Sequence, residues 1–407
     1  MVGASLAVAL KPTGLKTLVV EAVAPDSDQQ ASYDERTVAL TYSARLIYEA
    51  MGVWQSIAEN QAEPIKDIHI SNKGHFGMTH LSCEDVGTEA LGYVVPTRVI
   101  GRVLWAAMAD CERIEQCCPA KAIAMDPIKG GNCVTIETLE GNGPGGQANT
   151  RQIRTRLVVI ADGGRSFSKD SKDQDYLENN RYSQSAILSI VTTNQDHGQR
   201  AYERFTHEGP IAFLPHGRSR YATVWSTETD HIKERMALDD HEFIRQLQAT
   251  FGDRAGQLSR PSPRKCYPLG HYINQETIGH HQVTIGNAAH IVHPVAGQGF
   301  NLGLRDVALL AQMLGEANET EFADRDMLNR FQESRRHDTQ MVSQFTDGLI
   351  RIFSNNLALP AFIRNVGLAG IELFPPAKRF LLRRTMGLAG KQSRLARGQP
   401  LGMKTNE

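Results

Sequence analysis

The sequence predicts an α/β fold of two interlaced domains followed by a helical carboxyl-terminal region. The short uninterrupted apolar run at 157–161 is typical of a strand that is buried on both faces in a parallel sheet, and a further strand is expected at 282–285. Between 183 and 226, several runs alternate apolar and polar residues, which predicts consecutive antiparallel strands. Beyond Asn329 the apolar residues recur at helical spacing.

The size and composition of the chain are those of an ordinary globular protein with two domains. It has 407 residues, of which 41% are hydrophobic and 22% are charged, and its formal net charge is -1. A near-neutral chain has no general attraction for nucleic acid, so we expect no nucleic-acid partner. Its six cysteines include no Cys-x-x-Cys pair, so the sequence indicates neither a disulfide framework nor a zinc site.

The opening residues predict the second half of a dinucleotide-binding βαβ unit. A helix-compatible segment at 5–10 leads through a turn to a short apolar strand at 16–21. Gly3 matches only the last glycine of the GxGxxG fingerprint, and Glu21 stands about 20 residues on, where an acidic residue holds a ribose hydroxyl. The sequence does not contain the first strand and the first two glycines, so we expect the reading frame to start upstream. An ordinary helix–strand pair is the alternative interpretation.

A second candidate site follows the apolar strand at 157–161, which ends in Asp162-Gly163. Open α/β sheets bind their ligands at the carboxyl ends of the strands, where this carboxylate and glycine would lie. A strand-to-turn junction that uses Asp-Gly for its turn geometry is the alternative interpretation.

The third and most specific segment reads GNAAHIVHPVAGQGFNLGLRD and covers residues 286–306. Asn287, at a strand end, can reach a ribityl or phosphate oxygen. The loop glycines Gly297 and Gly299 allow backbone N–H groups to close on a planar ligand. A helix that starts near Asn301 points the positive end of its dipole back at that ligand, which suits a negatively charged reduced flavin.

His290 and His293 are three residues apart and raise the alternative of a metal site. A single His-x-x-His pair without a third ligand is a weak signal, and the loop prolines and glycines argue against a preformed cage. We therefore favour a structural or pocket role for both histidines and expect no metal.

Together these segments resemble the three flavin motifs of single-component aromatic hydroxylases of the para-hydroxybenzoate hydroxylase type. The resemblance covers nearly the whole chain and is closer to the ubiquinone-biosynthesis branch, the 2-polyprenyl-6-methoxyphenol hydroxylases. The stretches that carry the closer resemblance are DERTVAL (34–40), GVWQSIAE (52–59), IHISNKGHFG (68–77), ERFTHEGPIAFLP (203–215) and HPVAGQGFNLGLRD (293–306).

The resemblance implies a Rossmann-like FAD-binding domain that is interlaced with an antiparallel-sheet substrate domain. NADH or NADPH would reduce the flavin, O2 would form a C4a-hydroperoxide, and its distal oxygen would pass to the ring of a polyprenylated phenol. A different ring position, a soluble phenol, or a non-catalytic scaffold among other ubiquinone-biosynthesis proteins are the alternatives. Because half of the first motif is absent, we expect the printed chain to hold FAD poorly, which absorbance in the flavin bands would test.

The resemblance also implies roles for residues on the adenosine and phosphate side of the cofactor. Gly3 would approach the pyrophosphate, and Glu21 would hold the adenosine ribose. Arg36 would approach the flavin or its phosphates, while Arg98 and Arg102 fall in the segment that contacts the pyrophosphate. Arg98 is the weakest of these assignments, because that segment departs from the usual pattern of the family.

On the flavin side, the resemblance implies that Asp162 supports the site and that Asn287 faces the ribityl chain. Asn287 replaces the aspartate more usual in the family, which removes a charge but keeps a hydrogen-bonding side chain. Pro294 would lie near the flavin as a catalytic-site residue, and Gly299 with Asn301 would touch the O2 edge of the ring. Gly286 and Gly297 complete the expected cofactor contacts.

Two further positions concern the substrate domain. Tyr267 ends an expected strand and could hydrogen-bond a phenol as a catalytic residue, although a core tyrosine is equally consistent with the pattern. Glu203 and Arg204 are interpreted as a solvated or paired surface couple. An amphipathic helix is expected at 239–251, and 140–150 as a hairpin tip.

The carboxyl-terminal region bears on the location of the protein. Between Ile350 and Pro400, nine arginines and lysines accompany the single acid Glu372. Such a stretch can rest on anionic lipid or on a partner protein, and a packed helix with a solvated face is the alternative. The implied polyprenyl tail favours membrane contact. No apolar run is long enough to cross a bilayer, and no signal peptide opens the sequence, so we expect a cytoplasmic protein, free or peripheral at the inner face of the membrane.

These patterns define the expected domain boundaries. The FAD-binding domain is expected to be discontinuous, with the substrate domain inserted twice. The expected limits are 1–66, 95–180 and 270–330 for the FAD-binding domain, 67–94 and 181–269 for the substrate domain, and 331–407 for the carboxyl-terminal helices.

Overall fold

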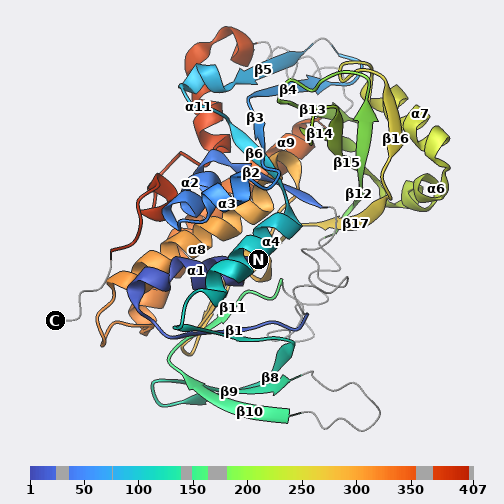
Figure 1. Ribbon diagram of the computed structural model, residues 1–407. Coiled ribbons are helices and arrows are strands. Elements are labelled where there is room, and N and C mark those ends of the chain that lie inside the picture. Colours follow the sequence, from blue (N-terminus) through green and yellow to red (C-terminus); the bar gives the residue numbers. More distant parts are fainter. Residues whose placement is uncertain (24–35, 76, 139–148, 164–180, 354–369, 403–407) are drawn as a thin grey trace.

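A large antiparallel sheet and a smaller parallel unit are joined by a layer of helices in the computed structural model (Figure 1). The residues that it describes are 1–23, 36–75, 77–138, 149–163, 181–353 and 370–402.

The parallel unit consists of two strand pairs under three helices. Strand β1 (Thr17–Val20) pairs with β7 (Ile114–Cys117), and β11 (Val158–Ile160) pairs with β20 (Gln282–Thr284), each in parallel. The short β19 (Ile278–Gly279) pairs with β20 in antiparallel orientation. The covering helices are α1 (Val2–Ala9), α4 (Thr97–Ala109) and α8 (Gln298–Glu316).

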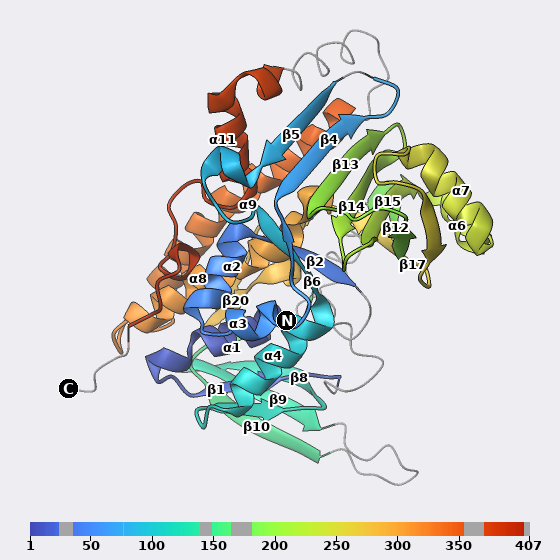
Figure 2. The ribbon, with the colours of Figure 1, turned by 45° about the horizontal axis from the view of Figure 1, so that its top comes forward.

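The opposite side of the parallel unit is covered by a three-stranded meander. Figures 1 and 2 show this meander on the far side of β1 from α1, α4 and α8. Apolar side chains of the meander pack against Leu18 and Val20 of β1 and Val158 of β11, which gives the parallel strands two buried faces. Its strands are β8 (Ala120–Ile128), β9 (Gly131–Thr138) and β10 (Asn149–Thr155). Most of the hairpin tip expected at 140–150 lies outside the described residues.

The large sheet has one face covered by helix α7 (Asp240–Phe251). A cluster of aromatic side chains fills the space between them, and the rings of Phe213 and Phe251 stack with centroids 3.8 Å apart. The strand order begins at one edge with β16 (Leu258–Pro261), β12 (Arg181–Thr193), β15 (Arg220–Glu228) and β14 (Gly209–Pro215). It continues with β13 (Arg200–Thr206), β4 (Asp67–Asn72) and β5 (Met78–Ser82), and β17 (Lys265–Gly270) also pairs with β12.

A small antiparallel sheet connects the parallel unit to the large sheet. Its central strand β6 (Gly92–Pro96) pairs with β2 (Thr37–Thr41) and β3 (Glu63–Ile65). Helices α2 (Tyr42–Ala50) and α3 (Trp54–Ala58) lie between β2 and β3 in the chain. Further short pieces are α6 (Ile232–Ala237), β18 (Tyr272–Ile273) and β21 (His290–Ile291).

Two helices make up most of the described carboxyl-terminal region. Helix α9 (Arg325–Phe353) begins beside α8 and reaches the large sheet, where Leu349 packs against Phe205 and Val295. Helix α11 (Pro375–Thr385) follows. Among the described residues, no helix combines the length and apolarity needed to cross a membrane.

The expected α/β class, with an antiparallel second sheet and a helical carboxyl-terminal region, is confirmed. The expected helix at 239–251 and the antiparallel run from 183 to 226 are also confirmed. Strand β13 additionally pairs in parallel with β4. Helix α8 begins at Gln298, three residues before the expected start, because its N-cap residue is Gly297, which has a left-handed backbone conformation.

Candidate functional site

The start of helix α8 is fixed by a glycine that approaches strand β2. Gly297 has a φ of 62°, and a Cβ atom placed on it would lie 3.0 Å from the Cβ of Ala39. A larger residue would strain the backbone and push the loop away from β2. Among the described residues, no side chain caps the N–H groups at this helix end. The positive end of the helix dipole at this position favours an anionic ligand.

Asn301 holds this helix start against β2. Its Oδ1 accepts hydrogen bonds from the backbone N–H of Thr41 at 2.8 Å and from the Thr41 hydroxyl at 3.2 Å. Its Nδ2 donates to the backbone oxygens of Ala39 at 2.8 Å and Gly297 at 2.6 Å. The buried amide is thus occupied by protein groups. Any contact of Gly299 and Asn301 with a flavin edge would therefore come from their backbone.

The three glycine-containing motifs meet at one end of the parallel unit. A Cβ atom on Gly3 would lie 3.4 Å from the Cβ of Ala161, next to Asp162 at the end of β11. Gly286, which has a φ of 64° at the end of β20, would bring a Cβ atom to 3.1 Å from Val2. Segments separated by more than a hundred residues therefore share one crevice at the carboxyl ends of β11 and β20, where open α/β sheets bind ligands.

Three of the predicted contact residues have exposed side chains around this crevice. Asp162, Asn287 and Pro294 are all exposed, although neighbouring loop residues such as His293 are fully buried. Polar side chains that stay exposed beside a backbone cradle can bind a ribityl chain or a ribose. The closely packed glycine backbones, the exposed polar groups and the uncapped helix end together fit an elongated dinucleotide with a planar ring.

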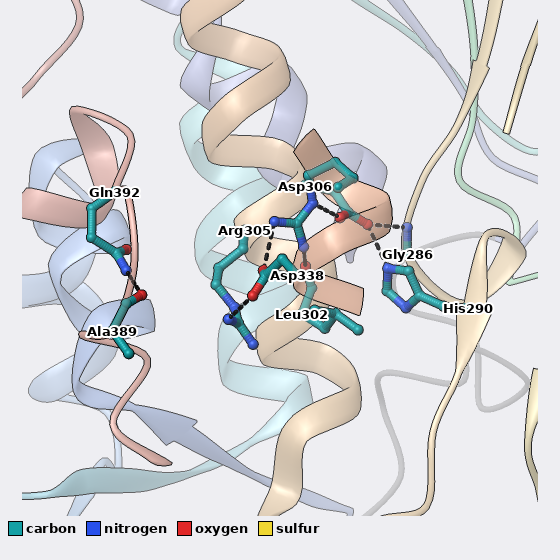
Figure 3. A network of polar contacts seen from close by, with 9 residues as sticks. Gly286, His290, Leu302, Arg305, Asp306, Asp338, Ala389 and Gln392 are labelled. Carbon is teal, nitrogen blue, oxygen red and sulfur yellow. Dashed lines mark hydrogen bonds and ion pairs between the residues drawn. The ribbon is translucent and has the colours of Figure 1, made fainter. Parts of the chain in front are cut away.

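A buried ionic network supports the crevice from behind (Figure 3). The carboxylate of Asp306 on α8 accepts the backbone N–H of Gly286 at 2.9 Å, His290 Nε2 at 2.7 Å and Arg335 Nε at 2.6 Å. Burial would raise the pKa of Asp306, but the interactions with His290, Arg335 and Gly286 lower it to about 2. The backbone of Gly286 is therefore held in place by a fixed negative charge.

The same network joins helices α8 and α9. Arg335 Nη1 pairs with Asp338 Oδ2 at 2.6 Å, and Arg305 Nη1 pairs with Asp338 Oδ1 at 2.9 Å. These charged residues were not predicted from the sequence. The signal that could have found them is Asp306 itself, a carboxylate directly before the apolar run at 307–311, since a charge in such a setting needs a partner.

The histidines take the structural positions that the sequence analysis favoured. His290 pairs with Asp306. His293 is fully buried, burial lowers its pKa to about 4, and its Nδ1 accepts the N–H of Val295 at 3.2 Å. His293 is therefore neutral near pH 7. The described part of the chain contains no cluster of three or more potential metal ligands.

The residues expected on the adenosine side are more dispersed. Glu21 follows β1, and its Oε1 accepts the N–H of Val23 at 3.2 Å. Arg102 is exposed on α4, and Arg98 on the same helix donates to Gln61 Oε1 at 3.2 Å. The roles assigned to Glu21, Arg98 and Arg102 stay predictions.

Arg36 and Tyr267 connect the crevice to the large sheet. The guanidinium of Arg36 lies 5.1 Å from the centre of the Tyr267 ring, a cation–π contact between the residue before β2 and strand β17. Tyr267 is only partly buried, and its expected role beside the substrate stays a prediction.

Glu203 does not lie on the solvated surface that the sequence analysis favoured. Its side chain is half-buried, and this burial raises its pKa to about 8. It was misassigned because alternation shows that Glu203 and Arg204 face opposite sides of β13 but does not show which sides are covered. Arg204 is half-buried on the other face, where its Nη1 contacts Ser71 Oγ at 3.5 Å.

Residues 1–346 match the family described as FAD binding domain. The chain belongs to this flavoprotein family. Ubiquinone hydroxylase UbiL of Rhodospirillum rubrum is 30% identical over 98% of this chain and 91% of the relative. The 3-demethoxyubiquinol 3-hydroxylase of Escherichia coli is 28% identical over 95% of this chain and 96% of the relative. These relatives confirm the resemblance to flavin-dependent hydroxylases of ubiquinone biosynthesis.

Solved structures support the same fold for this FAD-dependent monooxygenase. The p-nitrophenol 4-monooxygenase PnpA from Pseudomonas putida superimposes with a TM-score of 0.74 at 18% identity, over 96% of both chains. PqsL from Pseudomonas aeruginosa gives 0.70 at 20% identity, over 91% of this chain and 97% of the other. At these identities the likeness shows the fold alone. The cofactor follows from the family match, which identifies FAD as the dinucleotide that this chain binds.

Proposed function

We propose that the chain hydroxylates the aromatic ring of a polyprenylated methoxyphenol in ubiquinone biosynthesis, using FAD, O2 and NADH or NADPH. The names of its relatives support the pathway. The observation that carries the proposal is the meeting of the three motifs at one crevice, next to the face of the large sheet that α7 does not cover. Bound FAD, once reduced, would supply the oxygen atom from O2 in a form that an electron-rich ring accepts.

The protein residues would position the ring system and exclude water. The N–H groups at the start of α8 would stabilise negative charge on the reduced ring. Asn301 and the Asp306 network would keep this helix start and the Gly286 backbone in a fixed position. Asn287 would bind the ribityl chain, while Pro294 and Tyr267 would border the substrate space.

The large sheet offers this space an apolar wall. Register places four apolar side chains in one row with Glu203, on the face that also carries Phe205, which packs against Val295 of the loop before α8. They are Leu188, Val224 and Ala212 on one side of Glu203 and Ile70 on the other. Such a wall suits an aromatic ring and excludes water from it.

The test is oxidation of NADH or NADPH by the FAD-reconstituted protein with and without a 2-prenyl-6-methoxyphenol. We expect the phenol to stimulate consumption and to gain one hydroxyl group, located by mass spectrometry. Isomers of the phenol with the methoxy group moved around the ring, and a phenol without the prenyl chain, test the alternative ring positions and the soluble substrate. Consumption that no phenol stimulates would contradict the proposal.

We further infer that helix α11 contacts an anionic membrane surface. Leu373 is 82% exposed, Phe374 59% and Phe380 66%, an unusual group of apolar side chains for a water-facing surface. Arg379 and Arg383 are exposed on the same helix and would pair with lipid headgroups. Lys378, by contrast, is buried and pairs with Asp85 at 3.1 Å, so it anchors α11 to the protein.

Sedimentation with lipid vesicles tests this contact. We expect binding to phosphatidylglycerol vesicles, weaker binding to phosphatidylcholine vesicles, and loss of both when Leu373, Phe374 and Phe380 are replaced by serine. Met78, which is 53% exposed on β5, provides a control substitution to serine outside the helix. Equal sedimentation of the triple variant and the native protein would contradict the inference.

A further inference from the structure

Glu203 is placed in the middle of the apolar wall by the register of the large sheet. It lies opposite Ala212 of β14 and Ile70 of β4. Its neighbours two positions away on the same face are Ala201 and Phe205. Among the described residues, the carboxyl group has neither an ion pair nor a hydrogen bond. A lone carboxyl group on an apolar face is costly, so its retention there points to a ligand.

The two neighbours of Glu203 on this face show what it faces. Phe205 packs against Val295 of the loop before α8. Ala201 belongs to a cluster that includes Ala39 of β2, the residue approached by Gly297. Glu203 therefore lies between the two points where the sheet meets the flavin crevice. Its side chain is nevertheless only partly buried, so a ligand can still reach it.

The other titratable and charged groups on this side of the large sheet lie on other elements than β13. They are His293 in the loop, Arg36 with Tyr267 at the β17 edge, and His271 with Asp347 beside α9. Tyr202 and Arg204 lie on the opposite face of β13, toward α7. None of these groups appreciably shifts the pKa of Glu203, which burial alone raises to about 8. A base works best when its pKa is near the working pH.

We propose that Glu203 binds the phenol hydroxyl of the substrate and acts as the base that removes its proton. This inference rests on the proposed function and adds a catalytic residue to it. The alternative, a structural carboxyl group inside a closed core, does not agree with its position between two contacts with the flavin crevice.

The proton step is balanced within the substrate and the carboxyl group. The phenol O–H bond breaks, a new O–H bond forms on the carboxylate of Glu203, and the electron pair stays on the phenolate oxygen. The ring becomes more electron-rich and accepts the oxygen atom supplied by the hydroxylation reaction. The carboxyl group then returns its proton to the first oxygen, and the hydroxylated ring carbon releases its hydrogen to water as a proton.

The variant Glu203→Gln separates removal of the phenol proton from binding of the phenol. In Glu203→Gln the side chain still hydrogen-bonds the phenol but cannot take its proton, so we expect kcat to fall roughly 10²- to 10⁴-fold with little change in phenol affinity. In the native protein kcat/KM should rise with pH through about pH 8, and this rise should be absent from Glu203→Gln. The control is Glu228→Gln, which changes an exposed glutamate at the end of β15.

Binding gives a readout that does not depend on turnover. We expect the FAD-reconstituted protein to bind 2-methoxyphenol roughly 10- to 100-fold more tightly than 1,2-dimethoxybenzene, which lacks the hydroxyl. Glu203→Leu should abolish this preference. Unchanged preference in Glu203→Leu, or unchanged kcat and pH profile in Glu203→Gln, would overturn the proposal. If the preference depends on Glu203 but no phenol is turned over, the proposed function fails while the recognition role of Glu203 holds.

Discussion

The carboxyl groups of Asp306 and Glu203 differ in their neighbours: Asp306 has hydrogen-bonding and charged partners, and Glu203 has none among the described residues. Asp306 receives a backbone N–H, a histidine and an arginine, and its pKa is lowered to about 2. Glu203 lies among apolar side chains, and its pKa is raised to about 8. Burial disfavours charge at both positions, so the partners decide the outcome.

One protein thus keeps a fixed charge on α8 and a titrating carboxyl group on β13. The Asp306 carboxylate stays ionised and holds the Gly286 backbone in the flavin crevice. The Glu203 carboxyl group can exchange a proton near neutral pH and would serve the substrate. Two carboxyl groups with pKa values pushed apart are a common arrangement in acid–base enzymes.

The largest expected effect is the loss of the fixed charge. Asp306→Asn would remove one of the two carboxylates that compensate the buried Arg335, and with it the charged acceptor of His290 and of the Gly286 N–H. We expect the free energy of unfolding to fall by about 3–5 kcal/mol, measured by urea denaturation. Glu316→Gln on the exposed end of the same helix is the control and should change it by less than about 0.5 kcal/mol. A loss as small as in the control would show that the network does not stabilise the fold.

The second effect concerns the pH dependence of stability. The pKa of Glu203 is raised in the folded state from 4.5 to about 8, so the folded protein binds more protons than the unfolded chain in this range. Its contribution is fully present below about pH 4.5 and is lost as the pH rises to about 8. We expect Glu203→Gln to be more stable than the native protein at about pH 8.5, by roughly 2–4 kcal/mol, and to show a flatter profile in denaturation at several pH values. If the stability of the native protein and that of Glu203→Gln change with pH in parallel, Glu203 does not have the raised pKa of an unpaired carboxyl group.

The third effect compares two asparagines of the flavin motif. Asn301→Ala removes four buried hydrogen bonds, so we expect a loss of about 2–3 kcal/mol in the free energy of unfolding. Asn287 is exposed, so Asn287→Ala should leave stability unchanged and weaken FAD binding. FAD titration and urea denaturation of both variants check this. Equal losses of stability in the two variants would contradict a structural role for Asn301 and a purely FAD-binding role for Asn287.

The smallest effect is at the start of α8. Gly297→Ala should cost about 1–2 kcal/mol through its positive φ and its contact with Ala39, and it should also weaken FAD binding. Gly14→Ala has a similar φ of 73° with open space around it, so it provides the matched control for the φ cost alone. If both variants bind FAD equally well, the close approach to β2 does not shape the crevice.

Local patterns were enough to predict much of the fold and the centre of the site. Apolar runs and alternation predicted both sheets, and the glycine-spaced segment predicted the helix that begins at the crevice. These features depend on neighbours in the chain, which a single sequence displays.

Long-range pairing could not be predicted from the same patterns. Asp306 and Arg335 are 29 residues apart on different helices, and only packing of α8 on α9 brings them together. Alternation placed Glu203 opposite Arg204 but did not show that one face of β13 meets the loop before α8. Which face of a strand is covered depends on the topology of the whole chain.

The central claim is that this flavoprotein transfers an oxygen atom from O2 to a phenol ring. Its most direct test is a reaction of the FAD-reconstituted protein with NADH or NADPH, a 2-prenyl-6-methoxyphenol and isotopically labelled O2. The account predicts one labelled oxygen atom in the product ring, as detected by mass spectrometry. Labelled hydrogen peroxide together with an unchanged phenol would contradict it.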